Sequence, residues 1–242
     1  MVSEPAREPV LVGVAAASQR EEEPGAGREP AALMAAALEE AARDAGDPTL
    51  LRDADAVYVP RGMTAYADPA RLVASLVGAV RARSVLFEIG VLQTSLFTRA
   101  ARAIQSGDAD VVLVTGGEAK YREQKAQRAG CPAPVTDQGD ARPDQTLRPA
   151  ADIIHPLEIE HGLGMPVRQY AVMEGALRHA QKQPLEAHRR RLGELYAGFS
   201  RIARDNPDAW SREAVEAEGI AGGVLLAVHL VRHSILRLRS LI

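Results

Sequence analysis

Apolar residues in the first half of the chain fall into short continuous runs, which are typical of strands covered on both faces of a sheet. These runs occupy residues 9–17, 55–60, 84–89 and 110–115. Between them, apolar side chains recur every three or four positions, which predicts helices over 31–45, 69–76 and 96–105. This alternation predicts an α/β fold with a mainly parallel sheet of about four to five strands, in which we expect 85–89 and 110–115 to be neighbours.

The residues at the ends of these elements support the assignment. Asp68 precedes Pro69, a pair that caps and starts the second helix. Gly90 begins the loop before the third helix, and Gly107 ends that helix. Thr94 and Ser95 follow the loop, and their hydroxyl groups are of the kind that caps a helix.

The pattern changes after Glu118. Residues 120–151 are polar and rich in proline, glycine and glutamine without a sustained period, which predicts a loop. Helical spacing resumes at Pro166 and again at Pro184. The predicted organisation is therefore an α/β part over 1–119, a helical subdomain over 120–210 and a C-terminal tail over 211–242.

Composition narrows the class of protein. The 242 residues are 46% hydrophobic and 25% charged, with a formal net charge of −3, which is ordinary for a globular chain and excludes a disordered one. No strongly basic face indicates nucleic acid, and the apolar run within the tail is too short to span a membrane. A single cysteine cannot form an internal disulfide, and the start MVSEPAREPV lacks the pattern of a signal peptide. We expect a cytoplasmic protein.

Candidate chemistry is sparse. Thr94 and Ser95 lie where a strand ends and a helix begins, which is where α/β sheets collect their chemistry, so either could serve as a nucleophile; capping is the favoured role. Cys131 stands in a proline-rich stretch with nothing before it to activate a thiol, which favours a bystander over a nucleophile. His155 and His161 are six residues apart, which does not fit a metal-binding helix, and we expect no metal.

One segment carries a recognisable pattern. The strand at 84–89, its glycine-containing loop and the helix that ends in AIQSGDADVVLVTGGEA resemble the thiolase superfamily. The opening PVLVGVAAASQR and the later HPLEIEHGLGMPVRQYAVMEGALR are similar to actinobacterial thiolase-like proteins that are commonly labelled acetyl-CoA acetyltransferases. The resemblance implies a thiolase-like half-fold, with a mainly parallel sheet covered by helices and an inserted helical loop subdomain.

The same resemblance implies a function in lipid metabolism. Thiolases transfer acyl groups between coenzyme A and a carbon nucleophile through a cysteine thioester, so acyl-CoA is the implied ligand. Gly164 and Met165, in the implied loop domain, are the candidate CoA contacts. The family's nucleophile falls at or beside Gly90, where no cysteine stands, and the chain is shorter than the two-half family subunit. We therefore expect cysteine-dependent catalysis to be impaired.

Two alternatives remain from the resemblance. The chain could be a non-catalytic CoA-binding or scaffolding subunit that another chain completes, or a retro-aldolase of the thiolase-like type. A half-fold would leave one face of the third helix exposed, with Leu96, Phe97, Ala100, Ala103 and Ile104 uncovered. The apolar stripe of the tail, from Val224 to Ile242, would cover part of this face, or a second copy would do so in a homodimer.

Overall fold

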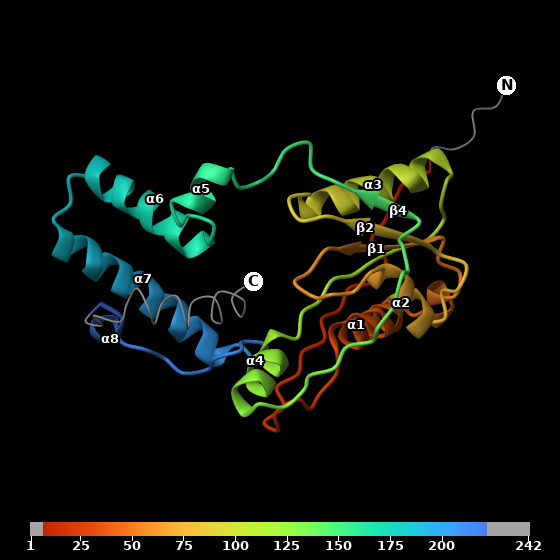
Figure 1. The fold of residues 1–242 in the computed structure, drawn as a ribbon, viewed down its shortest axis with the longest axis horizontal. Helices are drawn as coiled ribbons and strands as arrows, with labels where there is room; N and C mark the ends of the chain where they lie inside the picture. Colours follow the sequence, from red (N-terminus) through yellow and green to blue (C-terminus); the bar gives the residue numbers. More distant parts are fainter. Residues whose placement is uncertain (1–6, 222–242) are drawn as a thin grey trace. The chain divides into compact units, whose positions relative to one another are not determined.

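The computed structural model describes residues 7–221, which form parts of two compact units (Figure 1). One unit is Met1–Ile153 and the other is Ile154–Ile242. The boundary therefore lies between residues 153 and 154, whereas the sequence pattern placed it between 119 and 120. The difference arises because residues 120–153 pack on the α/β part instead of joining the helices that follow.

A parallel four-stranded sheet is the centre of the first unit. It consists of β1 (Ala56–Pro60), β2 (Arg83–Phe87), β3 (Val112–Val114) and β4 (Gln145–Leu147), in the order β3-β1-β2-β4. The predicted α/β class with a mainly parallel sheet is confirmed. The expectation that the strands around 85–89 and 110–115 are neighbours is wrong, because β1 lies between β2 and β3 and pairs with both.

Helices cover both faces of this sheet (Figure 1). On one face, α1 (Pro30–Asp44) and α2 (Pro69–Leu76) enclose a core with alternate β1 side chains, Val57 and Val59 among them. A short 3-10 helix, η1 (Pro48–Leu51), follows α1. On the other face, α3 (Gln93–Ser106) packs on the alternate residues of β1 and β2. The predicted covering helices are confirmed.

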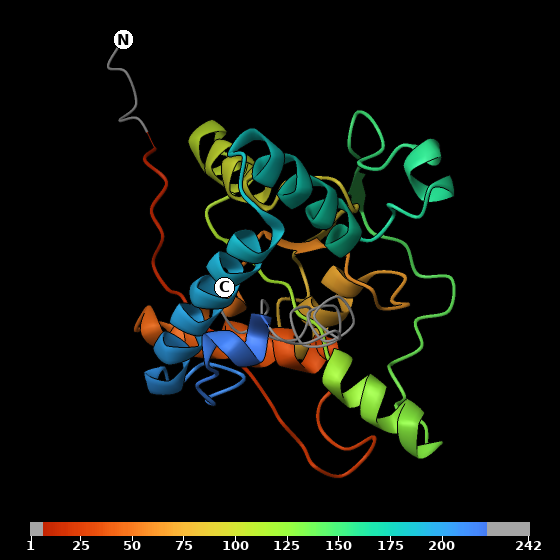
Figure 2. The same cartoon turned by 90° about the vertical axis from the view of Figure 1, so that its left-hand side faces the viewer.

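The first predicted strand does not form. Residues 9–17 lie outside the sheet, and the side chains of Val10 and Leu11 are 70% and 75% exposed (Figure 2, red segment). The segment runs along α1, where the backbone N–H of Val14 donates to Asp44 at 2.9 Å. Its apolar run is typical of a strand, but it pairs with none of the four strands, although β3 pairs only with β1 among the described residues.

The predicted loop over 120–151 contains two elements that the pattern missed. These are the helix α4 (Lys120–Ala129) and the edge strand β4. Both carry few apolar residues, and β4 is only three residues long, so neither produces a hydrophobic period. Buried Arg122 fixes the region by donating to the backbone oxygens of Gly25 at 3.2 Å and Pro134 at 3.0 Å.

The second unit is helical in its described part. It contains α5 (Pro156–Glu160), α6 (Pro166–Ala180), α7 (Leu185–Asp205) and α8 (Ala217–Ala221). The helices predicted from Pro166 and Pro184 are confirmed. Helices α7 and α8 pack closely at Gly193, where an added Cβ would lie 2.6 Å from the backbone oxygen of Ala217 (Figure 2). The predicted apolar stripe Val224–Ile242 lies outside the described residues.

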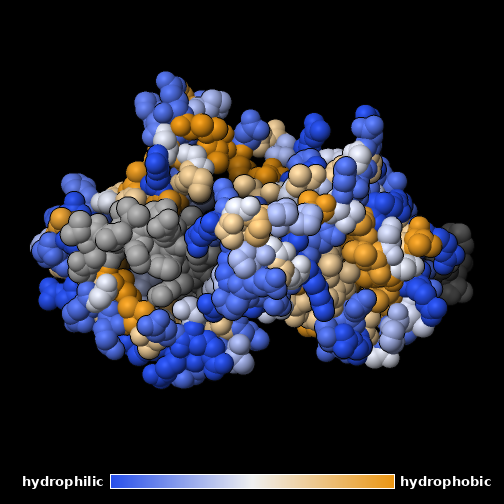
Figure 3. Space-filling view, turned by 60° about the horizontal axis from the view of Figure 1, so that its bottom comes forward, coloured by the Kyte–Doolittle hydropathy of each residue, from blue (hydrophilic) through white to orange (hydrophobic). Residues whose placement is uncertain are grey.

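The face drawn in Figure 3 is largely polar, with several groups of apolar residues between the polar ones. Exposed large apolar side chains include Val10, Leu11 and Val12 in the first unit and Tyr170, Val172 and Met173 on α6. Between residues 7 and 221, no helix combines the length and apolar character needed to cross a membrane.

Candidate functional site

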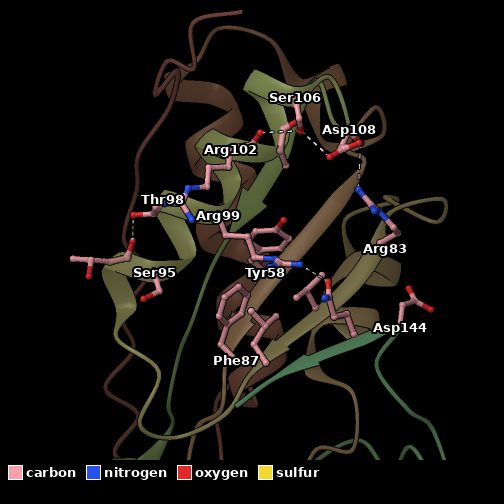
Figure 4. A pocket seen from close by; sticks show the side chains of 15 residues that line it. Tyr58, Arg83, Phe87, Ser95, Thr98, Arg99, Arg102, Ser106, Asp108 and Asp144 are labelled. Carbon is pink, nitrogen blue, oxygen red and sulfur yellow. Dashed lines mark hydrogen bonds between the residues drawn. The ribbon is translucent and has the colours of Figure 1, made fainter. Parts of the chain in front are cut away.

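A groove of about 780 Å³ lies between α3 and the sheet face formed by β1, β2 and β4 (Figure 4). Its floor is apolar and its sides carry hydroxyl and charged groups. The lining residues are Tyr58, Arg83, Val85, Phe87, Thr94, Ser95, Thr98, Arg99, Arg102, Ala103, Ser106, Asp108, Asp144, Gln145 and Leu147. Of all these, the sequence pattern had singled out only Thr94 and Ser95 as candidates for chemistry.

Parallel pairing places the floor residues side by side. Tyr58 on β1 pairs with Val85 on β2, and Phe87 on β2 pairs with Leu147 on β4. Because alternate residues of a strand share a face, all four side chains point toward α3. The rings of Tyr58 and Phe87 lie with their centroids 5.3 Å apart at 51°. The result is a largely aromatic floor.

The orientation of α3 decides which of its side chains line the groove. Leu96 and Ala100 are buried against the sheet, with exposed fractions of 2% and 9%. The expectation that both are uncovered is therefore wrong, because the sheet of this unit covers them. Phe97, one position further round the helix, is 55% exposed, as expected. Arg99 lies beside the groove and donates to Gln145 Oε1 on β4 at 2.8 Å.

The opposite rim is held by Asp144, which immediately precedes β4. Its carboxylate accepts a hydrogen bond from the Ser84 backbone N–H at 2.7 Å and forms an ion pair with Arg71. The Ser84 hydrogen bond, followed by the charge of Arg71, lowers the pKa of Asp144 below its ordinary value despite some desolvation. Asp144 therefore anchors the start of β4 to β2 as a charged group.

Gly90 occupies the turn that leads into α3. The Val91 N–H donates to the Glu88 backbone oxygen at 3.0 Å across this turn, and Gly90 has a φ of +101°. An added Cβ would lie 2.8 Å from Ile153 Cγ2 and 2.9 Å from Pro149 Cγ. Both the backbone conformation and the crowding exclude a side chain here, so no nucleophile can stand at this position in this conformation.

Thr94 and Ser95 lie inside the first turn of α3. The N-cap residue is Leu92, which makes no side-chain capping bond, so the favoured capping role of these two hydroxyls is wrong. Within the described residues, neither hydroxyl bonds to a histidine or a carboxylate. Serine and threonine need a positioned base to act as nucleophiles, so this arrangement does not activate them.

A carboxylate at the carboxyl edge of the sheet was missed by the sequence analysis. Glu118 follows Gly116 and Gly117, which lie after β3 and are in neither a strand nor a turn. Its Oε1 accepts the Met63 N–H at 2.6 Å, and its Oε2 is buried with no hydrogen-bond partner in the described chain. The diglycine before it was the only signal in the sequence.

The remaining candidates lie elsewhere. Half-buried Cys131 follows Gly130 at the carboxyl end of α4, which presents carbonyl rather than N–H groups. His155 caps α5, where its Nδ1 accepts the Leu157 N–H at 3.2 Å. The described residues contain no cluster of metal-binding side chains. Gly164 and Met165 belong to the second unit, unlike Gly90, and Met165 is the half-exposed N-cap residue of α6.

Comparison with known proteins adds a structural neighbour. No protein-family model matches the chain, and no curated protein has significant similarity to it. Among solved structures, a monomeric SCP2-thiolase like protein type 1 from Mycobacterium smegmatis matches with a TM-score of 0.65 and 26% sequence identity. The fold is thiolase-like. The match covers 90% of this chain but only 40% of the neighbour, so the chain spans well under half of that protein's length.

Proposed function

We propose that this thiolase-like chain binds CoA thioesters and does not form a cysteine-linked acyl intermediate. The observation that carries the proposal is Gly90, at or beside the position where the thiolase resemblance places the nucleophile. Its φ of +101° and its packing against Pro149 and Ile153 leave no room for a cysteine side chain. The similarity to an SCP2-thiolase like structure supports the other claim, that the chain binds CoA thioesters.

The other hydroxyl and thiol groups do not replace the missing nucleophile. Acylation by a thioester needs a thiolate or a hydroxyl with a neighbouring base. Thr94 and Ser95 make no such contact within the described residues, and Cys131 follows a different helix, α4. This arrangement supports the part of the proposal that denies acyl transfer to the chain.

For the CoA contact we propose Gly164 and Met165. Met165 is 53% exposed and precedes Pro166 at the start of α6, which has no side-chain cap. Pro166 has no N–H and the Arg168 N–H donates to the Met165 backbone oxygen at 2.9 Å, so in this first turn the Val167 N–H is the donor proposed for a phosphate oxygen of coenzyme A. We propose that the protein binds CoA thioesters in the cytoplasm.

A second candidate is a subunit that another chain, or a second copy, completes. The open side of the groove and the 55% exposure of Phe97 favour it. The structural neighbour is described as monomeric, and the burial of Leu96 and Ala100 reduces the apolar area offered to a partner. Sedimentation of the full chain across micromolar concentrations separates this candidate from a monomeric binder.

Titration of the purified full chain with CoA and acetyl-CoA tests the main proposal when it is combined with intact-mass spectrometry. We expect saturable binding and an unchanged protein mass. Met165→Glu should weaken binding by placing a negative charge beside the phosphates, and Met63→Glu on the first unit is the matched control, since Met63 is 68% exposed. Absence of binding, or acetylation lost in Cys131→Ala, would contradict the proposal.

A further inference from the structure

The groove beside α3 changes in polarity from one end to the other. Arg83 and Arg102 line it where the strands begin, and Phe87 and Leu147 line it where the strands end (Figure 4). A matching ligand has an anionic group at one end and an apolar body along the rest. We propose that the groove binds an organic anion with an unbranched hydrocarbon chain, headed by a carboxylate or a phosphate.

Arg83 and Arg102, at the polar end of the groove, have guanidinium N–H groups that are not used in hydrogen bonds within the described residues. Arg102 makes no side-chain hydrogen bond or ion pair in the described part of the chain. Arg83 donates one hydrogen bond, to the backbone oxygen of Asp108 at 3.2 Å. A guanidinium carries five N–H donors in a planar fork, so both side chains can receive the oxygens of a carboxylate or a phosphate.

The acidic residues of the lining do not cancel this charge. Asp144 is neutralised by its ion pair with Arg71, a residue outside the lining. Asp108 accepts the Ser106 hydroxyl at 2.7 Å. With Arg99 the lining holds three guanidinium groups against two carboxylates, and one of those carboxylates is paired from outside. The groove therefore favours an anion.

Tyr58 supplies a further hydrogen-bonding group in the groove. Its side chain is only 3% exposed and lies in the floor (Figure 4), yet its hydroxyl has no hydrogen-bond partner between residues 7 and 221. The hydroxyl oxygen itself is not fully buried, so it opens into the groove and can bond there to water or to a ligand. An oxygen of a ligand headgroup can accept from this hydroxyl.

The rest of the floor suits a hydrocarbon chain. Val85, Phe87 and Leu147 line the groove from two neighbouring strands. Val85 and Phe87 are only 3% and 1% exposed, so of the three Leu147, which is half-buried, offers most of the accessible apolar surface. The groove volume of about 780 Å³ is in the range of small-molecule sites. Burial of a chain on this surface supplies the hydrophobic part of the affinity, while the arginines orient the headgroup. This inference does not depend on binding of a CoA thioester.

Fluorescence titration of the full chain with dansylaminoundecanoate tests the proposal. We expect saturable binding, with displacement by dodecanoate or dodecyl phosphate and not by uncharged dodecanol; the stronger of the two anions identifies the headgroup. Arg102→Gln should weaken binding about tenfold, since a charge-assisted bond is lost. Thr98→Trp should abolish it by filling the groove from an exposed position on α3.

The control is Arg128→Gln, on an exposed residue in the last turn of α4, which should change the affinity by less than about twofold. Absence of saturable binding would overturn the proposal, as would displacement of the probe by dodecanol as effective as that by the two anions. So would an affinity in Arg102→Gln and Thr98→Trp equal to that of the unchanged chain. So would association of two copies that Thr98→Trp abolishes, since a second copy would then occupy the groove. Acetyl-CoA titrated into the same variants reports separately on the proposed function, and its affinity should not change.

Discussion

Arg99 on α3 donates a hydrogen bond of 2.8 Å to Gln145 on β4, and this bond joins the helix to the edge of the sheet across the groove. Strand β4 is three residues long and pairs only with β2 within the described residues, so it has few other interactions to hold it. The Arg99–Gln145 contact therefore helps to fix the shape of the groove.

Loss of this contact should have a modest effect on stability. We expect Gln145→Ala to lower the free energy of unfolding by about 1 kcal/mol, the usual net contribution of an exposed hydrogen bond to a charged group. Urea denaturation measures the change. Arg99→Ala with Gln145→Ala should cost little more than either single change, because both remove the same bond. Full additivity of the two single changes would contradict a direct coupling.

Gly90 should tolerate no side chain. Gly90→Ala combines a strained backbone at φ +101° with contacts of 2.8 and 2.9 Å, so we expect a loss of about 2–4 kcal/mol. Gly130→Ala is the matched control, because Gly130 also has a positive φ, of 67°, but no atom lies within 4 Å of its added Cβ. That variant should lose only about 1 kcal/mol from backbone strain. Thermal unfolding measures the stability of both variants. Equal losses of stability in Gly90→Ala and Gly130→Ala would contradict the claim that crowding around Gly90 adds to the backbone strain.

Gly193 and Gly175 should respond in opposite directions. Gly193→Ala places a Cβ 2.6 Å from the Ala217 backbone oxygen, so it should separate α8 from α7 and destabilise the second unit. Gly175 lies within α6 with open space around its Cβ position, and Gly175→Ala should stabilise the helix by about 0.5–1 kcal/mol. Circular dichroism during thermal unfolding detects both changes. Destabilisation by Gly175→Ala would show that α6 is packed differently.

Asp144 should make stability depend on pH. Its pKa is lowered in the folded state, so the charged carboxylate stabilises the fold above its unfolded pKa of about 3.9, and this contribution disappears as the pH falls through the lower folded value. Asp144→Asn should therefore be less stable than the unchanged chain at pH 7 and nearly equal to it in strong acid. Asp140→Asn, at an exposed position on the same loop, should show no such dependence. A constant difference for Asp144→Asn across this range would contradict the assignment.

The sequence predicted the architecture where local and tertiary preferences agree. The helices at Pro30, Pro69 and Pro166 start as expected, because a proline fits the first helical turn and apolar spacing follows it. The run 9–17 was misassigned because hydrophobicity alone does not distinguish a strand from an apolar segment that lies along a helix outside the sheet. Strand β4 was missed because three polar or half-exposed residues pair through their backbone and leave no periodic signal.

The groove could not be predicted from the sequence, because it too depends on tertiary contacts. Arg99 and Arg102 are three residues apart on one helix, which places them on a common side, but nothing local shows that Tyr58 and Phe87 lie beneath them. That contact depends on the pairing of β1 with β2 and on the packing of Leu96 against the sheet. Thr94 and Ser95 were found because they stand between a predicted strand and a predicted helix, shortly after the loop that begins at Gly90.

Equilibrium titration of the full chain with acetyl-CoA, followed by recovery of the ligand, tests the proposed function most directly. A CoA-thioester-binding protein without a nucleophile at Gly90 should bind acetyl-CoA saturably and release it chemically unchanged. Failure to bind, or recovery of free CoA together with an acetylated chain, would contradict it.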